Sequence, residues 1–273
     1  MKRTLALATI IGASWAAVAL ADGGGPSPGP SWGSPGLVDA SRGIRYVALD
    51  GGNTTIVEAV AVHGGKVLRW TNFRGRYGFP MVAWDGSMGG LTRSGERLVL
   101  ASPLGPIGTR FLLLDAGTLK VLARTRLHGA YAFDALSPDA SLMYLIQYLG
   151  RWGSINQPYA VRAFNWDTLR LYSGTIVDRR EPDEKMNGQP VTRAGSPNGW
   201  AYTLYTRPGK KPFVHALDTV RRRAFCVDLP WRDASSWISG AKMRVRGGTL
   251  ELRYDGGTIA RMNRKTLEVT ARR

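Results

Sequence analysis

Two residues of opposite charge occupy equivalent positions in two short repeated motifs. Asp134 lies three residues before Ser137-Pro-Asp, and Arg193 lies three residues before Ser196-Pro-Asn. If both motifs are turns that follow an inner strand, the two side chains point toward the same level of a shared central channel. They could form an ion pair there, or they could bind a ligand and act in acid–base catalysis. Asp39, at the expected start of the first repeat, is a further candidate carboxylate of this channel.

A second group of candidate residues lies in the longest segments between the expected strands. Residues 72–90, 150–158, 177–190 and 228–240 together combine aromatic rings, guanidinium groups and carboxylates. Rings stack on the apolar faces of sugars, and guanidinium groups bind carboxylates, so this composition suits a sugar or another polar polymer. The same rings could instead seal contacts beneath the loops. The candidate ligand-binding residues are Arg74, Arg76, Tyr77, Trp84, Arg151, Trp152, Trp231 and Trp237.

Catalysis would require one of the carboxylates to act as a general base. Asp134 or Asp85 is the candidate base, and Arg193 could neutralise the charge of an anionic sugar or a lactone. This hydrolase or lyase hypothesis requires two carboxylates to converge at one end of the channel, and Glu181 is the third candidate. The sequence contains no nucleophile elbow, phosphate-binding glycine loop or dinucleotide fingerprint. We therefore expect a binding module, with an enzyme as the alternative.

Metal and cofactor sites are not indicated by the sequence. The three histidines are far apart, and the acidic segment 178–184 lacks the spacing of a calcium loop and is interleaved with basic residues. Cys226 is the only cysteine, so no intramolecular disulfide can form. Its apolar, alternating neighbours predict a buried structural thiol. We expect no metal and no cofactor.

The elements that must position these residues repeat along the chain. Each repeat begins with a tight turn and an apolar strand, followed by an alternating strand that ends in Asp or Asn and by a second turn and strand. Residues 44–71 form one degenerate unit of this kind. Units of about 45 residues with four strands are typical of propeller blades, and about five of them fit residues 37–273. The turn-and-strand motif occurs at 92–100, 137–145, 196–204 and, more weakly, 244–252.

The Ser-Pro-Asp turn before an apolar strand, with the strand-Asp-Thr-x-x-Leu hairpin after it, resembles the WD-type and YVTN-type propeller repeats of bacterial exported proteins. The resemblance covers residues 44–271 and implies an all-β protein, a β-propeller of about five four-stranded blades. It implies little about function, because propellers carry enzymes, receptors and scaffolds alike. A β-sandwich built from the same short strands is the structural alternative.

The first residues of the chain predict export. Lys2 and Arg3 precede a mostly apolar run that ends at Ala19-Leu20-Ala21, which supplies the small residues that a signal peptidase requires. The run is short for a bilayer span, although a retained anchor is the alternative. No later segment approaches transmembrane length, so we expect an extracytoplasmic location, secreted or in the cell envelope, with no transmembrane span in the mature chain. The expected divisions are a signal peptide over 1–21, a Gly/Pro/Ser-rich linker over 22–36 and a propeller domain over 37–273.

The chain is strongly basic, with 37 lysines and arginines against 20 acidic residues and a formal charge of +17. A basic protein attracts polyanions, although a high arginine content can also reflect the base composition of the genome. The basic residues are scattered and no nucleic-acid motif accompanies them, so nucleic acid is not an expected partner. We predict a binding or scaffold module that engages an envelope polysaccharide, another polyanion or a protein through its long loops. A purely structural role in an envelope complex is the third hypothesis.

Overall fold

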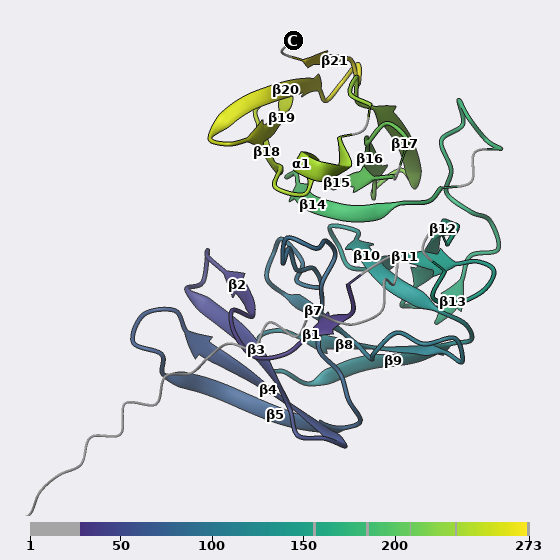
Figure 1. Ribbon diagram of the computed structural model, residues 1–273. Helices are drawn as coiled ribbons and strands as arrows, with labels where there is room; N and C mark the ends of the chain where they lie inside the picture. The colour runs from purple at the N-terminus through teal and green to yellow at the C-terminus, as the bar shows by residue number, and fades with distance from the viewer. Residues whose placement is uncertain (1–27, 155–156, 184–185, 208, 233, 272–273) are drawn as a thin grey trace, which may run out of the picture.

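The computed structural model describes residues 28–154, 157–183, 186–207, 209–232 and 234–271. Nearly all of the regular structure is β, with one short helix, α1 (Ser235–Ile238). The described strands form six antiparallel sheets, of which one has only two strands. The other five are arranged as the blades of a β-propeller, which confirms the predicted fold (Figure 1). The signal peptide predicted over 1–21 lies outside the described residues.

Within each blade the strands follow one another from the innermost to the outermost position. Blade 1 consists of β2 (Leu37–Asp39), β3 (Ile44–Asp50), β4 (Thr54–Ala61) and β5 (Val67–Arg74), and blade 2 of β7 (Arg97–Ala101), β8 (Thr109–Asp115) and β9 (Val121–Leu127). Blade 3 consists of β10 (Tyr131–Leu136), β11 (Leu142–Tyr148), β12 (Tyr159–Asn165) and β13 (Arg170–Leu171). Blade 4 consists of β14 (Gln189–Gly195), β15 (Trp200–Thr206), β16 (Phe213–Asp218) and β17 (Arg223–Asp228), and blade 5 of β18 (Lys242–Arg246), β19 (Thr249–Tyr254), β20 (Gly257–Asn263) and β21 (Val269–Ala271).

The innermost position of blade 2 is irregular. Val99 N–H donates to Gly90 O at 2.7 Å, and Thr92 N–H donates to Arg97 O at 3.0 Å, so residues 90–92 take the place of a first strand. Gly90 has a φ of 102°, and a Cβ there would lie 2.6 Å from Val99 O. Only glycine fits this close approach of two backbones.

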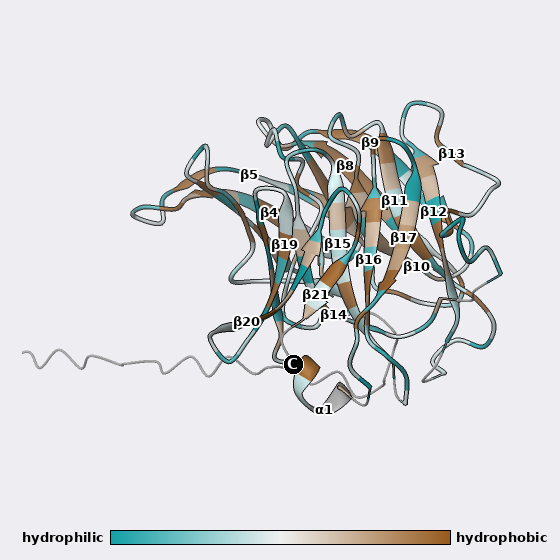
Figure 2. Ribbon diagram, turned by 90° about the horizontal axis from the view of Figure 1, so that it is seen from above, coloured by the Kyte–Doolittle hydropathy of each residue, from teal (hydrophilic) through white to brown (hydrophobic). Residues whose placement is uncertain are grey.

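Alternating side chains explain why the blades pack as they do. Successive residues of a strand point to opposite faces of its sheet. Leu98 and Leu100 therefore join the core between blades 1 and 2, whereas Val99 joins the core between blades 2 and 3. Similar cores lie between blades 3 and 4 and between blades 4 and 5. Figure 2 shows apolar colour along the strands and polar colour in the turns at their ends.

Residues 30–33, which lie within the segment predicted as a linker, make backbone and side-chain contacts with the first blades. Strand β1 (Pro30–Ser31) pairs with β6 (Phe79–Pro80), and Trp32 Nε1 donates to Tyr77 O at 2.6 Å. Gly33 N–H donates to Ala48 O, which extends the inner edge of blade 1. The single tryptophan supplies the apolar contact that the surrounding glycines and prolines lack. Residues 22–27 lie outside the described residues.

Three buried tyrosines connect one blade to the last turn of the next. Tyr46 OH of blade 1 donates to Ala116 O of blade 2 at 3.2 Å, and Tyr144 OH of blade 3 donates to Thr219 O of blade 4 at 2.6 Å. Tyr202 OH of blade 4 accepts a hydrogen bond from Arg264 Nε of blade 5 at 3.2 Å. All three side chains are fully buried. Each tyrosine therefore combines apolar burial between blades with one directed hydrogen bond.

We expect Tyr144→Phe to lower the free energy of unfolding by about 1–2 kcal/mol, because it leaves the buried Thr219 carbonyl without its donor. Tyr254→Phe is the matched control, since Tyr254 is 37% exposed and its hydroxyl has no hydrogen-bond partner among the described residues. Urea unfolding of both variants measures the difference. Equal midpoints for the two variants would contradict the proposed role of the hydroxyl.

Candidate functional site

The sequence-predicted pair lies at the throat of the propeller. Arg193 Nη1, from β14, donates to Asp134 Oδ1, from β10, at 2.5 Å and to Thr203 Oγ1 at 3.0 Å. The side chains of Asp134 and Arg193 are only 3% and 12% exposed. Both inner strands shift register beside these residues, between Phe133 and Ala135 and between Pro190 and Thr192. Such irregularities re-aim side chains, and here the strands bring opposite charges together across two blades.

A buried histidine lies on the same row of blade 4 as Arg193. Thr203 is opposite Arg193 in one strand pair and opposite His215 in the next. Burial lowers the pKa of His215 to about 4, although the nearby Asp134 carboxylate acts in the other direction. His215 Nε2 and Asp134 Oδ2 are buried, and neither has a hydrogen-bond partner among the described residues. His215 is therefore neutral near pH 7, and Asp134 uses only one of its two oxygens.

The throat opens toward the short turns that follow the innermost strands. A cavity of about 250 Å³ is lined there by Asp134 and Arg193, together with Ser137, Ser196 and Trp200. A shallower space of about 710 Å³ continues from it along residues 37–41 of blade 1 and residues 91–93 of blade 2. The charged pair is accordingly reached from the end opposite to the long loops.

The other end of the channel is capped by the link between blades 1 and 2. Trp84 N–H donates to Pro190 O at 3.0 Å, and Asp85 N–H donates to Val191 O at 3.1 Å. Asp85 Oδ2 accepts hydrogen bonds from Thr192 Oγ1 at 2.7 Å and from Lys242 Nζ at 3.0 Å. One carboxylate thus ties this loop to blades 4 and 5.

Burial alone would raise the pKa of Asp85, but hydrogen bonds from Ser87, Thr192 and Lys242 outweigh it and hold the pKa below its usual value. Asp85 is thus an ionised carboxylate that accepts several hydrogen bonds and holds the loop in place as a brace. Such a group is poorly suited to take a proton from a substrate.

The candidate carboxylates do not form a free pair in the described part of the chain. Asp85 binds Thr192, and Asp134 binds the next residue of β14, Arg193, so that each has its own partner. Glu181 lies in the link between blades 3 and 4, and Asp39 is occupied by Ser41 and Arg42 in its own turn. Among the described residues, no three His, Cys, Asp or Glu side chains come together as a metal site would require.

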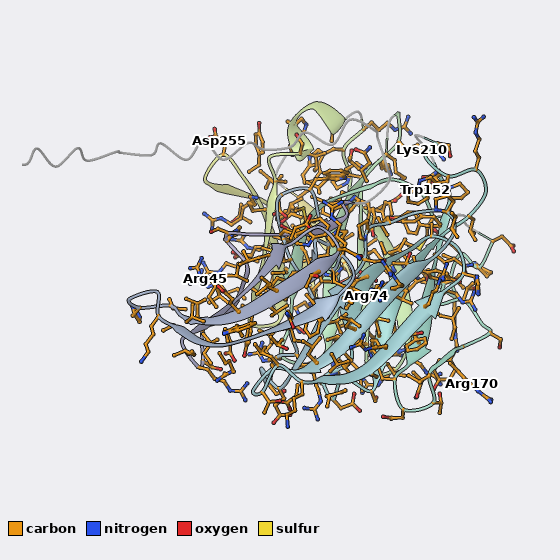
Figure 3. The ribbon with its side chains drawn as sticks, turned by 90° about the horizontal axis from the view of Figure 1, so that it is seen from below. Arg45, Arg74, Trp152, Arg170, Lys210 and Asp255 are labelled. Atoms are coloured by element: carbon orange, nitrogen blue, oxygen red, sulfur yellow. The ribbon has the colours of Figure 1, made fainter. Side chains whose placement is uncertain are left out.

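The long loops share one end of the molecule, because blade links and second-to-third-strand loops alternate with the short turns along each antiparallel blade. Figure 3 shows Trp152 and Lys210 toward this end and Arg170 toward the opposite end. The rings mostly pack inward. Trp152 contacts Tyr148 edge-on at 5.7 Å, and Trp231 contacts Trp237 edge-on at 5.3 Å.

The remaining candidate residues differ in what they leave accessible. Tyr77 is buried, and its backbone N–H donates to Thr55 Oγ1. Arg76 is paired with Asp50 at 2.7 Å and lies over the Trp32 ring at 4.7 Å. Trp84 is 44% exposed. Arg74 and Arg151 are exposed as well.

The structure contains a basic groove at the long-loop end that the sequence analysis did not predict. It has a volume of about 370 Å³ and lies between the loop after β15 and the loop after β17. Arg207 Nη2 contacts Asp228 Oδ1 there at 2.9 Å, while Lys210 and Arg232 are exposed. The signal was present in the run Arg-Pro-Gly-Lys-Lys, a turn with three cations at 207–211. The groove is lined by Arg207, Gly209, Lys210, Lys211, Asp228 and Arg232.

The sequence matches no family model and no curated protein. Among solved structures, the chain is similar to hydrazine synthase from Kuenenia stuttgartiensis, with 12% identity, 92% of this chain and 66% of that one covered, and a TM-score of 0.48. It is also similar to BamB from Moraxella catarrhalis, with 13% identity, 90% and 63% covered, and a TM-score of 0.48. It is similar as well to TolB from Acinetobacter baumannii, with 9% identity, 84% of this chain and 51% of that one covered, and a TM-score of 0.44. The chain spans half to two thirds of the length of these proteins, and a likeness this distant carries no argument about function.

We expect Arg193→Ala to destabilise the fold by about 3 kcal/mol, because it leaves the Asp134 carboxylate buried without its cation. The double variant Asp134→Asn with Arg193→Ala should recover part of that loss. Chemical unfolding of the two single variants and the double variant gives the coupling. If the effects of the single variants simply add, the two residues do not interact.

His215 should make stability depend on pH in a defined window. Between pH 6.5 and about pH 4 the unfolded chain binds a proton at this position that the folded protein does not. The free energy of unfolding should therefore fall as the pH is lowered through this window, by up to about 3 kcal/mol at about 1.4 kcal/mol per pH unit, and the contribution should level off below it. His215→Gln should flatten that part of the profile, whereas the exposed His63→Gln should not. Identical profiles for the two variants would refute the assignment.

Proposed function

We propose that this protein is an extracytoplasmic binding or scaffold module whose long-loop end engages an acidic protein partner. The observation that carries the proposal is a set of exposed cations at that end, for which the described residues provide no carboxylate within ion-pair distance. Elsewhere the chain commonly pairs its arginines, as at Arg180 and Arg223. The unpaired set consists of Arg74, Arg151, Lys210 and Arg232.

A protein partner fits these residues better than a polysaccharide. Sugar binding requires ring faces that are open for stacking. Trp152, Trp231 and Trp237 pack against the cores between blades, which leaves Trp84 as the exposed tryptophan among the candidates. Unpaired cations around a largely sealed surface favour charge recognition, which steers association and depends on ionic strength.

The extracytoplasmic setting in this proposal rests on the predicted signal peptide. No helix in the described part of the chain has the length and apolar character needed to cross a bilayer. The hydrolase or lyase alternative receives no support from the throat, because the carboxylates there are engaged in structural contacts. We also assign the repeats to the WD-type and YVTN-type class as part of this proposal, on the turn and hairpin motifs of the sequence.

Poly-glutamate is a suitable probe for the long-loop end. We expect it to bind at low salt, and we expect Arg151→Ala combined with Lys210→Ala to weaken binding at least fivefold. Raising the salt toward physiological strength, where the screening length is about 8 Å, should weaken binding of the wild-type protein. Arg170→Ala is the matched control, because Arg170 is an exposed arginine at the opposite end. Calorimetric titration measures the wild type, the double variant and the control.

Equal binding by the double variant and the control would refute the proposed surface. Titration with polygalacturonate separates the two classes of partner. If this polymer binds more tightly than poly-glutamate, resists salt and loses affinity with Trp84→Ala, the long-loop end is a polysaccharide site and the proposal of a protein partner is wrong.

A further inference from the structure

The five blades share only four of the cores that a closed ring would have. Blades 1 and 2, 2 and 3, 3 and 4, and 4 and 5 each enclose an apolar cluster. No cluster of described residues joins blade 5 to blade 1. In Figure 1 these two blades lie next to each other at the left, and no described strand lies between them. We call the two facing sheet surfaces the seam.

The wall that blade 1 presents to the seam is mostly apolar, with Arg45, Glu58 and Asn72 as its polar residues. Its residues alternate with those buried against blade 2, and the strand register places them on one face. Val47, Glu58 and Trp70 form a row across three strands, flanked by a row with Leu49 and Ile56. Trp70 is 63% exposed and Val38 is 47% exposed. The wall comprises Val38, Arg45, Val47, Leu49, Ile56, Glu58, Val60, Val67, Trp70 and Asn72.

The wall that blade 5 presents is basic. Met243, Leu250 and Leu252 point toward blade 4, so the alternate residues face the seam. Glu251 is the single carboxylate of this face, and Arg261 contacts it at 3.5 Å. A further carboxylate, Asp255, lies in the turn after β19; Figure 3 shows it on the same side of the molecule as Arg45 of blade 1. The basic residues of the wall are Lys242, Arg244, Arg246, Arg253 and Arg261.

These two walls do not complement each other. Closing the ring would set the five basic residues of the blade 5 wall against a blade 1 wall whose one carboxylate is Glu58. Each charge buried there without a partner would be costly. Leaving the seam empty exposes a contiguous apolar sheet face, which typically marks an interaction surface. A segment placed between the walls could cover the apolar wall with one side and pair with the basic wall through the other.

We propose that the seam is a docking site for an amphipathic polypeptide segment that is apolar on one side and acidic on the other. Its apolar side would cover Val47, Ile56 and Trp70, and its acidic side would pair with Arg244 and Arg261. The argument is one of charge and apolar complementarity, and it does not depend on the long-loop end.

A second copy of this chain is a poor occupant. The apolar wall of a second copy could cover the apolar wall of the first, but the basic walls of both copies would then remain without carboxylates. The formal charge of +17 adds repulsion between copies. The proposal therefore commits to a different polypeptide that carries acidic residues.

Two synthetic peptides test the proposal directly. Both carry leucines on one side; the first carries glutamates on the other side and the second carries lysines. We expect the glutamate peptide to bind, as measured by fluorescence anisotropy, and the lysine peptide to bind at least tenfold more weakly. Trp70→Ala should weaken glutamate-peptide binding about tenfold at any salt, and Arg244→Ala should weaken it several-fold at low salt.

Matched controls come from the long-loop end and from the opposite face. Trp84→Ala removes an exposed tryptophan and Arg170→Ala an exposed arginine outside the seam, and neither should change peptide binding. Equal affinity for the two peptides, or binding that ignores Trp70→Ala, would overturn the proposal. Because Trp70 and Arg244 are exposed, these variants should fold normally, and circular dichroism verifies this.

A third experiment asks whether the seam closes on itself. Val38→Cys and Arg244→Cys place thiols on the innermost strands of the two walls, in a Cys226→Ser background. We expect no intramolecular disulfide under mild oxidation and a monomer in sedimentation. Rapid disulfide formation would show that blades 1 and 5 meet, and self-association abolished by Trp70→Ala would show that a second copy fills the seam. Either result would refute the proposal.

Discussion

Burial of each blade on both faces is the constraint on which this structure depends. A blade of three or four strands exposes two sheet faces, and its strands are apolar enough to require cover on both. Neighbouring blades supply that cover, and the alternation of side chains along each strand divides its residues between two cores. The first and last blades have one neighbour each. One face of blade 1 and one face of blade 5 therefore lack a covering blade.

Polar interactions then decide how the blades are fixed relative to one another. The tyrosines at positions 46, 144 and 202 anchor one blade to the last turn of the next. Asp85 acts over a longer distance, because it joins the link between blades 1 and 2 to blades 4 and 5 across the channel. This brace also closes the long-loop end of the channel. The Asp134–Arg193 pair faces a cavity that is lined in part by the short turns.

The polar groups of the channel mostly bind one another. The carboxylates that reach the channel are held by hydroxyls, backbone amides or cations, so that their charge stabilises the fold. What remains available is at the surface: unpaired cations on the long loops, and the unmatched walls of the seam. Both features suit recognition of another macromolecule, and neither requires a reacting group.

The sequence by itself determined the blades, because a turn motif and a period-two apolar strand are local patterns that survive in one dimension. It also determined that Asp134 and Arg193 lie at the same height along the central channel, since each lies three residues before an equivalent turn. Only the tertiary structure decided that Asp85 is a brace and that Trp152, Trp231 and Trp237 pack inward. It also decided that Trp32 anchors part of an expected linker and that no apolar cluster of described residues joins the last blade to the first. These outcomes depend on partners 45 or more residues away, or on two surfaces that are distant in the sequence, and a local pattern contains neither.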